Sequence, residues 1–219
     1  MTKRTKESPR KSNNRQKHTL VIIVCEGEKT ERIYFNHFRY LNKALHIEIV
    51  KGAEGKSYID LINKAIEAKI KYFDGTESEC YVWCVSDVDA DHKANDYKKI
   101  KNKQLRDYAD KAKSYGFNIA LSNPCFELWF LLHYTSFTTR YIKSYDELIL
   151  LLDKYIPNYH KNLDIYDQLL DKQNTALENS KKLMKYHQDK TENLDFFNVD
   201  TNPYTNVWSL VELLNSLQL

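Results

Sequence analysis

The sequence predicts an α/β protein in which a mostly parallel, four-stranded sheet is flanked by helices. Between residues 20 and 121, short apolar runs alternate with longer segments of helical periodicity, which is the pattern of βαβ units with right-handed crossovers. After Pro124 the periodic segments are all helical in spacing, and this predicts a helical C-terminal elaboration. The hydrophobic fraction of 42% and the charged fraction of 29% are those of a globular chain.

Residues 20–25 read Leu-Val-Ile-Ile-Val-Cys, a continuous apolar run that is typical of a strand buried on both faces of a parallel sheet. Residues 29–44 follow with the spacing of a helix. Residues 46–50 alternate as a second strand, and residues 58–72 carry apolar side chains at helical intervals.

A third apolar run covers residues 81–85, and a helix is predicted from 96 to 115 because Gly116 stands where helices commonly end. Residues 117–121 form the predicted fourth strand. Further helices are predicted at residues 126–134, 145–155, 163–170, 175–187 and 206–217.

Residues 1–18 form a basic tail. They hold seven Lys and Arg against one Glu, a net charge of +6, whereas the whole chain carries +3 and residues 19–219 therefore carry −3. We expect this tail to be disordered and to precede an α/β catalytic domain (19–134) and the helical elaboration (135–219). The tail either attaches nonspecifically to phosphate backbones or is a solubilising leader, and the sequence leaves both interpretations open.

The apolar runs are all far shorter than the roughly 20 residues that span a bilayer, and the basic start is not followed by the apolar stretch of a signal peptide. The four cysteines form no C-x-x-C pair and the seven histidines no H-x-x-x-H pair, which disfavours a disulfide framework and a zinc site. We therefore expect a cytoplasmic protein that has no membrane partner.

Acidic residues follow the first and third predicted strands. Glu26 comes directly after residues 20–25, whereas Asp87, Asp89 and Asp91 follow residues 81–85 at intervals of two. Ligands of open α/β sheets bind outside the carboxyl ends of the strands, and residues two apart in an extended chain lie about 6.5 Å apart on one side. Carboxylates gathered there repel one another unless a hard cation bridges them, and a bound Mg²⁺ or Mn²⁺ can activate water toward a phosphodiester.

An isolated D-x-D is more often a solvated acidic turn than a metal site. Under that interpretation, the Glu-Gly that ends the first strand of the same βαβ series would be a coincidence. The position of Glu26 therefore favours the metal site.

Residues after the fourth strand are further candidates. Asn123, Glu127 and His133 reach the same sheet edge if the strands are parallel, where Glu127 would complete the metal shell and the other two would contact substrate. The alternative is a capped helix, with Asn123 as the N-cap and Glu127 against the helix dipole. Lys29 would meet a substrate phosphate at the start of the first helix, or it is an ordinary exposed lysine.

The sequence Cys25-Glu-Gly-Glu-Lys29, followed by Ser86-Asp-Val-Asp-Ala-Asp91, resembles the Toprim domain of topoisomerases, primases and overcoming-lysogenization-defect nucleases. The resemblance implies a Toprim-like, Rossmannoid fold, with Glu26 in acid–base chemistry at the metal. It implies that Asp87 and Asp89 hold magnesium, with Asp91 as a weaker third contributor. Many Toprim turns carry an acid four residues after the glutamate, where this chain has Thr30, and Glu31 one place later is left without a definite role.

Two longer stretches narrow the resemblance. Residues 25–35 and the stretch Asn123-Pro-Cys-Phe-Glu-Leu-Trp129 with His133 are similar to the RloB family, whose members are regarded as Toprim proteins. That family is associated with restriction and phage-defence loci and is often encoded beside an ATPase. The similarity runs from about residue 19 through most of the chain, and it implies an AAA-type ATPase as a candidate partner.

Length and composition separate the reactions of Toprim proteins. A topoisomerase needs a DNA-gripping domain that bears a tyrosine, and a primase usually has a zinc ribbon and a larger catalytic body. The predicted function is therefore Mg²⁺- or Mn²⁺-dependent hydrolysis of DNA or RNA in anti-phage defence or restriction, with Glu26, Asp87 and Asp89 as catalytic residues. The alternative is a regulatory module that binds nucleic acid or an ATPase without turnover. The sequence does not distinguish DNA from RNA and does not give the oligomeric state.

Overall fold

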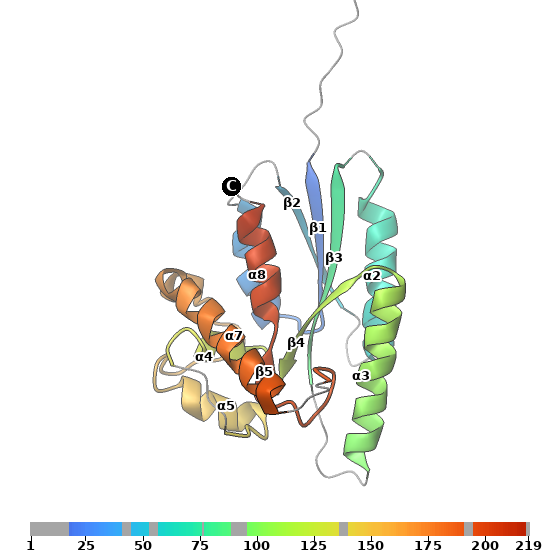
Figure 1. Cartoon of the computed structure of the whole chain (residues 1–219). Coiled ribbons are helices and arrows are strands. Elements are labelled where there is room, and N and C mark those ends of the chain that lie inside the picture. The colour runs from blue at the N-terminus through green and yellow to red at the C-terminus, as the bar shows by residue number, and fades with distance from the viewer. Residues whose placement is uncertain are drawn as a thin grey trace, which may run out of the picture.

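A five-stranded sheet with the strand order β2-β1-β3-β4-β5 forms the centre of the molecule (Figure 1). The structure is a computed structural model that describes residues 18–40, 45–52, 57–75, 77–88, 96–135, 140–190 and 195–217. The parallel strands are β1 (Thr19–Cys25), β2 (Leu45–Lys51), β3 (Glu79–Asp87) and β4 (Asn118–Asn123), and the short β5 (Tyr204–Thr205) pairs antiparallel with β4. The predicted α/β class and the mostly parallel sheet are confirmed.

Strand β1 is the most deeply buried strand because it lies between β2 and β3 and is covered on both faces. All residues from Leu20 to Cys25 have no exposed surface. Leu20, Ile22 and Val24 point into one hydrophobic core, and the alternate residues point into the other. The uninterrupted apolar run in the sequence reflects this burial on two sides.

Helices α2 (Tyr58–Tyr72) and α3 (Tyr97–Ser114) cover one face of the sheet (Figure 1). Helix α2 begins with a capping box, in which the Ser57 hydroxyl accepts the Asp60 backbone N–H (3.4 Å) and the Asp60 carboxylate accepts the Ser57 backbone N–H (3.0 Å). The cap fixes the start of α2 beside the carboxyl end of the sheet.

The other face packs against α1, the 3-10 helix η1 and the C-terminal half of the chain. Trp129 in α4, Leu210 in α8 and Val21 in β1 belong to one buried cluster, so the C-terminal helices complete the core of the sheet. The predicted domain boundary at residue 134 stays a prediction. The bounds on this side are α1 (Thr30–Asn36), η1 (His37–Tyr40), α4 (Glu127–Leu131), α5 (Tyr145–Leu152), α6 (Tyr166–Leu169), the 3-10 helix η2 (Leu170–Lys172), α7 (Gln173–Lys190) and α8 (Val207–Ser216).

The structure differs from the sequence-based expectation in short elements. Strand β5 was not expected, since two residues show no periodicity. The helix expected at 126–134 is shorter in the structure, where α4 covers only Glu127–Leu131. All five residues are buried, so no polar face marks the ends of the helix in the sequence. Helix α1 ends at Asn36 and continues as η1, and residues 41–44 of the expected helix lie outside the described residues. Within the described ranges, no helix is long and apolar enough to cross a membrane.

Candidate functional site

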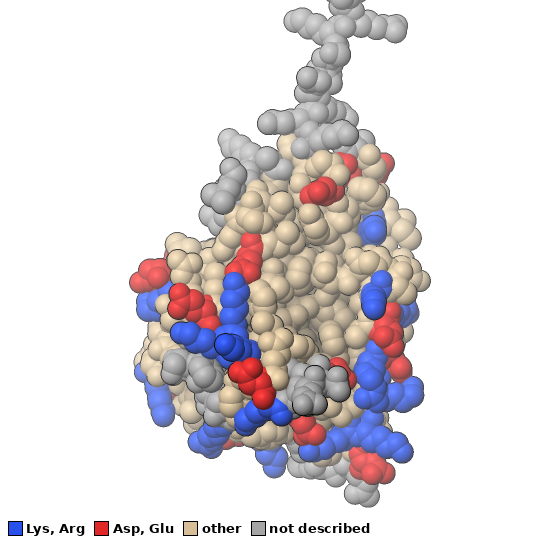
Figure 2. Space-filling view, in the orientation of Figure 1, with Lys and Arg blue, Asp and Glu red and all other residues tan. Residues whose placement is uncertain are grey.

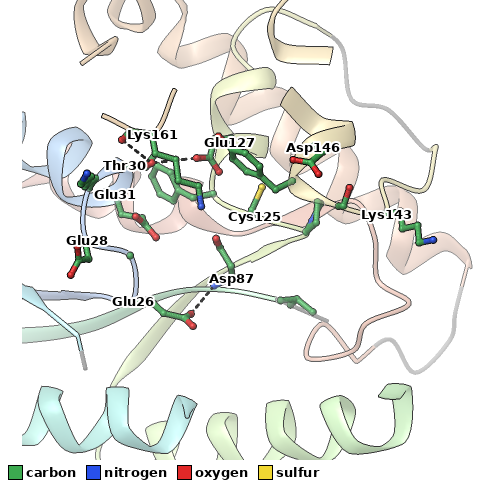
Figure 3. A pocket seen from close by; sticks show the side chains of 17 residues that line it. Glu26, Glu28, Thr30, Glu31, Asp87, Cys125, Glu127, Lys143, Asp146 and Lys161 are labelled. Carbon is green, nitrogen blue, oxygen red and sulfur yellow. Dashed lines mark hydrogen bonds between the residues drawn. The ribbon is translucent and has the colours of Figure 1, made fainter. Parts of the chain in front are cut away.

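A cavity of about 610 Å³ opens at the carboxyl ends of β1 and β3. It is lined by residues 26–31 of the β1–α1 turn, by the end of β3, by residues 124–127, and by residues 143–146 and 161 of the C-terminal half. Figure 3 shows the carboxylates of Glu26, Glu31, Asp87 and Glu127 around this cavity. Acids from segments far apart in the sequence thus meet at one edge of the sheet.

Glu26 is held at the point where β1 and β3 end together. Its backbone N–H donates to the Val85 carbonyl (2.9 Å), and its Oε2 accepts the backbone N–H of Asp87 (3.2 Å). Glu26 also lines a second cavity of about 140 Å³, which lies on the side of α2 and α3 and includes Ser57 and Lys101. Its carboxylate therefore stands at the boundary between two cavities.

Asp87 is the last residue of β3, and its carbonyl accepts the Tyr58 hydroxyl (2.7 Å). Its Oδ1 is buried and has no hydrogen-bond partner within the described part of the chain. Burial raises the pKa of this carboxyl well above its usual range, and repulsion from Glu31, Glu127 and Glu26 adds to the rise. A buried carboxylate oxygen without a partner is costly unless a cation reaches it.

Glu31 lies in the first turn of α1 and is only 4% exposed. Its carboxylate folds back over Gly27, where an added Cβ would overlap Glu31 Oε2 and lie 2.7 Å from Cδ. Burial raises the pKa of Glu31 to about 7, and repulsion from Glu127 and Glu26 adds to this rise, although Lys161 opposes it. The sequence analysis left Glu31 without a definite role, and only the structure shows that Gly27 leaves room for its carboxylate.

Glu127 begins α4 and is 1% exposed. Its Oε1 accepts hydrogen bonds from the Thr30 hydroxyl (3.3 Å) and the Tyr159 hydroxyl (3.2 Å). These donors fix the carboxylate between α1 and the C-terminal half, with its side chain facing the cavity (Figure 3). The expectation that Glu127 reaches the same edge as Glu26 and Asp87 therefore matches its position.

Asn123 and His133 do not line the cavity. The Asn123 side chain donates to the carbonyls of Val199 (3.1 Å) and Thr201 (2.8 Å), so it ties β4 to the C-terminal half, and it is not the N-cap of α4. His133 is 2% exposed, its Nδ1 is 2.8 Å from the Trp129 carbonyl, and burial lowers its pKa to about 4. Substrate binding by these two residues stays a prediction without geometric support, whereas Lys29 does line the cavity.

Asp89 and Asp91 fall in residues 89–95, outside the described residues, as do residues 1–17 of the tail. Among the residues that are described, no three His, Cys, Asp or Glu side chains form a ready-made metal cluster. The donor chemistry nevertheless fits a hard divalent cation, because the cavity presents carboxylate oxygens and the Asp87 Oδ1 lacks a partner.

A family model described as RloB-like protein matches residues 21–214. The chain belongs to the RloB-like family. The match runs from β1 to α8, so it covers both the sheet edge that bears the acids and the helical half that lines the cavity of this RloB-like protein. No curated protein and no solved structure matches the chain.

Proposed function

We propose that this RloB-like protein is a Toprim-type nuclease that hydrolyses a phosphodiester of DNA or RNA with Mg²⁺ or Mn²⁺. The observation that carries the proposal is the buried Oδ1 of Asp87, which has no hydrogen-bond partner among the described residues and lies in a cavity also lined by the carboxylates of Glu26, Glu31 and Glu127. Such an arrangement is unfavourable in a metal-free protein and becomes favourable when a divalent cation binds. An effector role in anti-phage defence or restriction, with a co-encoded ATPase as partner, completes the proposal.

Asp87 would hold the metal, with Glu31 and Glu127 facing it from the cavity walls and Asp89 as a further ligand from the adjoining segment. The metal supplies Lewis-acid activation of the phosphodiester when it is bound. Glu26 would take the proton of the attacking water, because the Asp87 N–H orients its carboxylate at the boundary between the two cavities.

The size and charge of the surroundings suit a nucleic acid. A cavity of about 610 Å³ accommodates a nucleotide-sized group. Figure 2 shows Lys and Arg side chains gathered along the edge of the molecule that α3 forms, and α3 contains seven Lys and Arg against two Asp. Lys101 of this helix lines the second cavity, which Glu26 also lines. A phosphate backbone that lies along α3 would pass the catalytic carboxylate.

The competing proposal is a module that binds nucleic acid or an ATPase without turnover. It requires only that the cavity and the basic helix α3 hold a ligand. The two proposals differ in the role of Glu26, since catalysis requires its carboxylate and binding does not. The module would be supported by two results together: wild type does not cleave nucleic acid, and Glu26→Gln still binds its ligand in a metal-dependent way.

A cleavage screen tests the proposal directly. The full chain is incubated with plasmid, single-stranded DNA and cellular RNA in Mg²⁺, in Mn²⁺ and in chelator, with and without the co-encoded ATPase. Glu26→Gln and Asp87→Asn should abolish cleavage. Glu28→Gln is the matched control, because Glu28 is a neighbouring cavity residue that is exposed and paired with Lys51. A folded, metal-loaded protein that cuts none of these substrates would refute the proposal.

A further inference from the structure

Lys161 brings a positive charge from the C-terminal half into the acidic cavity. Figure 3 shows its side chain running toward the space between Glu127 and Asp87. Its Nζ lies 4.5 Å from the centre of the Tyr145 ring, so one side of the ammonium faces an aromatic surface and the other faces carboxylates.

The backbone of Lys161 is anchored independently of its side chain. Its carbonyl accepts the Thr30 hydroxyl at 3.3 Å, and the nearby Asp164 carboxylate lies 2.8 Å from His37 Nε2. These contacts tie the segment to α1 and η1, and neither of them involves the Lys161 side chain. The residue itself is exposed, so the ammonium can withdraw from the cavity without disturbing buried packing.

Lys161 and the acids of the cavity each shift the pKa of the other. Burial by itself would lower the pKa of the Lys161 ammonium, but the carboxylates of Glu127 and Asp87 outweigh it and the pKa is raised. Lys161 in turn lowers the pKa of Asp87 and Glu31, against the larger effects of burial and mutual repulsion. Lys161 thus offsets part of the negative charge of the metal-free cavity.

We propose that Lys161 is a built-in counterion which the divalent metal displaces, and that the displaced ammonium then binds a phosphate of the substrate. This inference rests on the proposed nuclease function and adds a positioning residue from the helical half. A monovalent ammonium and a divalent ion are attracted to the same carboxylates, and they repel each other. Because the Lys161 stem is long and flexible, its charge moves toward the anion that arrives with the metal.

The alternative role for Lys161 is a permanent structural ion pair. The two roles predict opposite changes in metal affinity. A unit charge about 6 Å from a divalent ion opposes metal binding by about tenfold even at the dielectric constant of water. If Lys161 is a counterion that the metal displaces, removing its charge increases the affinity for the metal. If Lys161 instead holds the carboxylates in position, removing it disorders the ligands and lowers that affinity.

The test compares Lys161→Met with wild type and with Lys143→Met, using full chains. Lys143 is the matched control, since it lines the cavity but its side chain points away from the acids (Figure 3). Metal affinity is measured by calorimetry with Mn²⁺ in the absence of nucleic acid, at pH 8.5 so that protons compete little with the metal. Binding of an oligonucleotide is measured separately in Ca²⁺, to limit cleavage.

We expect Lys161→Met to bind Mn²⁺ about tenfold more tightly and the oligonucleotide about tenfold more weakly. Lys143→Met should change either affinity by less than about threefold, and Lys161→Arg should retain the metal affinity of wild type. Unchanged or weaker Mn²⁺ binding by Lys161→Met would overturn the inference even if wild type cleaves nucleic acid. Tighter Mn²⁺ binding in Lys161→Met, together with no cleavage by wild type, would support the counterion and refute the nuclease.

Discussion

Replacing Glu31 with Gln should stabilise the metal-free protein at alkaline pH. The Glu31 carboxyl is 4% exposed and its pKa is raised from 4.5 to about 7. The folded state therefore binds more protons than the unfolded state between these pH values, and stability falls as pH rises through that window. At about 1.36 kcal/mol per pKa unit, the penalty for ionising Glu31 is roughly 3 kcal/mol at pH 8.

Glu31→Gln keeps the shape of the side chain and removes this penalty, so the variant should exceed wild type by up to roughly 3 kcal/mol at pH 8 and by much less at pH 5. The difference between the two proteins is the relevant quantity, because His133 acts in the opposite direction. Its pKa is lowered to about 4, so it contributes stability that is lost as pH falls from about 6.5 to 4.

The assay is urea denaturation in chelator at pH 5 and pH 8, followed by tryptophan fluorescence and analysed by linear extrapolation. Glu28→Gln is the control for removing a charge from the same turn. Because it removes only an exposed ion pair with Lys51, its stability should change little and by the same amount at both pH values. Saturating Mg²⁺ should stabilise wild type more than Glu31→Gln. A Glu31→Gln variant that is less stable than wild type at pH 8 in chelator would refute the reasoning, since it would show that the carboxylate stabilises the fold.

Three further perturbations address other parts of the site. Gly27→Ala places a Cβ against the Glu31 carboxylate, so calorimetry should show weaker metal binding in a folded protein, and wild-type affinity would contradict the packing. Metal should raise the melting temperature of wild type, because a ligand at a hundredfold excess over Kd stabilises the folded state by about 2.7 kcal/mol. Asp89→Asn should lose most of this rise. An equal rise in both proteins would show that Asp89 is not a metal ligand. Deleting residues 1–18 should weaken nucleic-acid binding. The slope of log affinity against log salt concentration should become less steep by about 0.9 for each phosphate of duplex DNA that the tail neutralises. An unchanged slope would show that the tail does not contact the phosphates.

The sequence was sufficient to predict the four parallel strands and two of the acids at the edge of the sheet. A strand buried on both faces leaves an uninterrupted apolar run, as in β1, and the ends of two such runs locate Glu26 and Asp87. Glu127 was also identified as a candidate, because it follows the fourth strand of the same parallel series.

Lys161 and Glu31 could not be assigned from the sequence alone. Lys161 reaches the cavity through tertiary packing of a loop more than 30 residues beyond Glu127, and no local pattern marks such a contact. Glu31 looks like an ordinary acid in the first turn of a helix until its burial is known. Asn123 ends the fourth strand and His133 lies beyond it, but the structure shows their side chains in hydrogen bonds away from the cavity, which no sequence pattern indicated. Their predicted role in substrate binding stays a prediction.

The most direct measurement of the central claim is cleavage of nucleic acid by wild type, Glu26→Gln and Glu28→Gln in Mg²⁺ and in chelator, with metal binding of each protein measured by calorimetry. We predict that wild type and Glu28→Gln cut at least one substrate in metal but not in chelator. Glu26→Gln should stay folded, bind metal and fail to cut. Cleavage that persists in chelator, or cleavage by Glu26→Gln at the wild-type rate, would contradict a metal-dependent reaction in which Glu26 takes the proton of the attacking water.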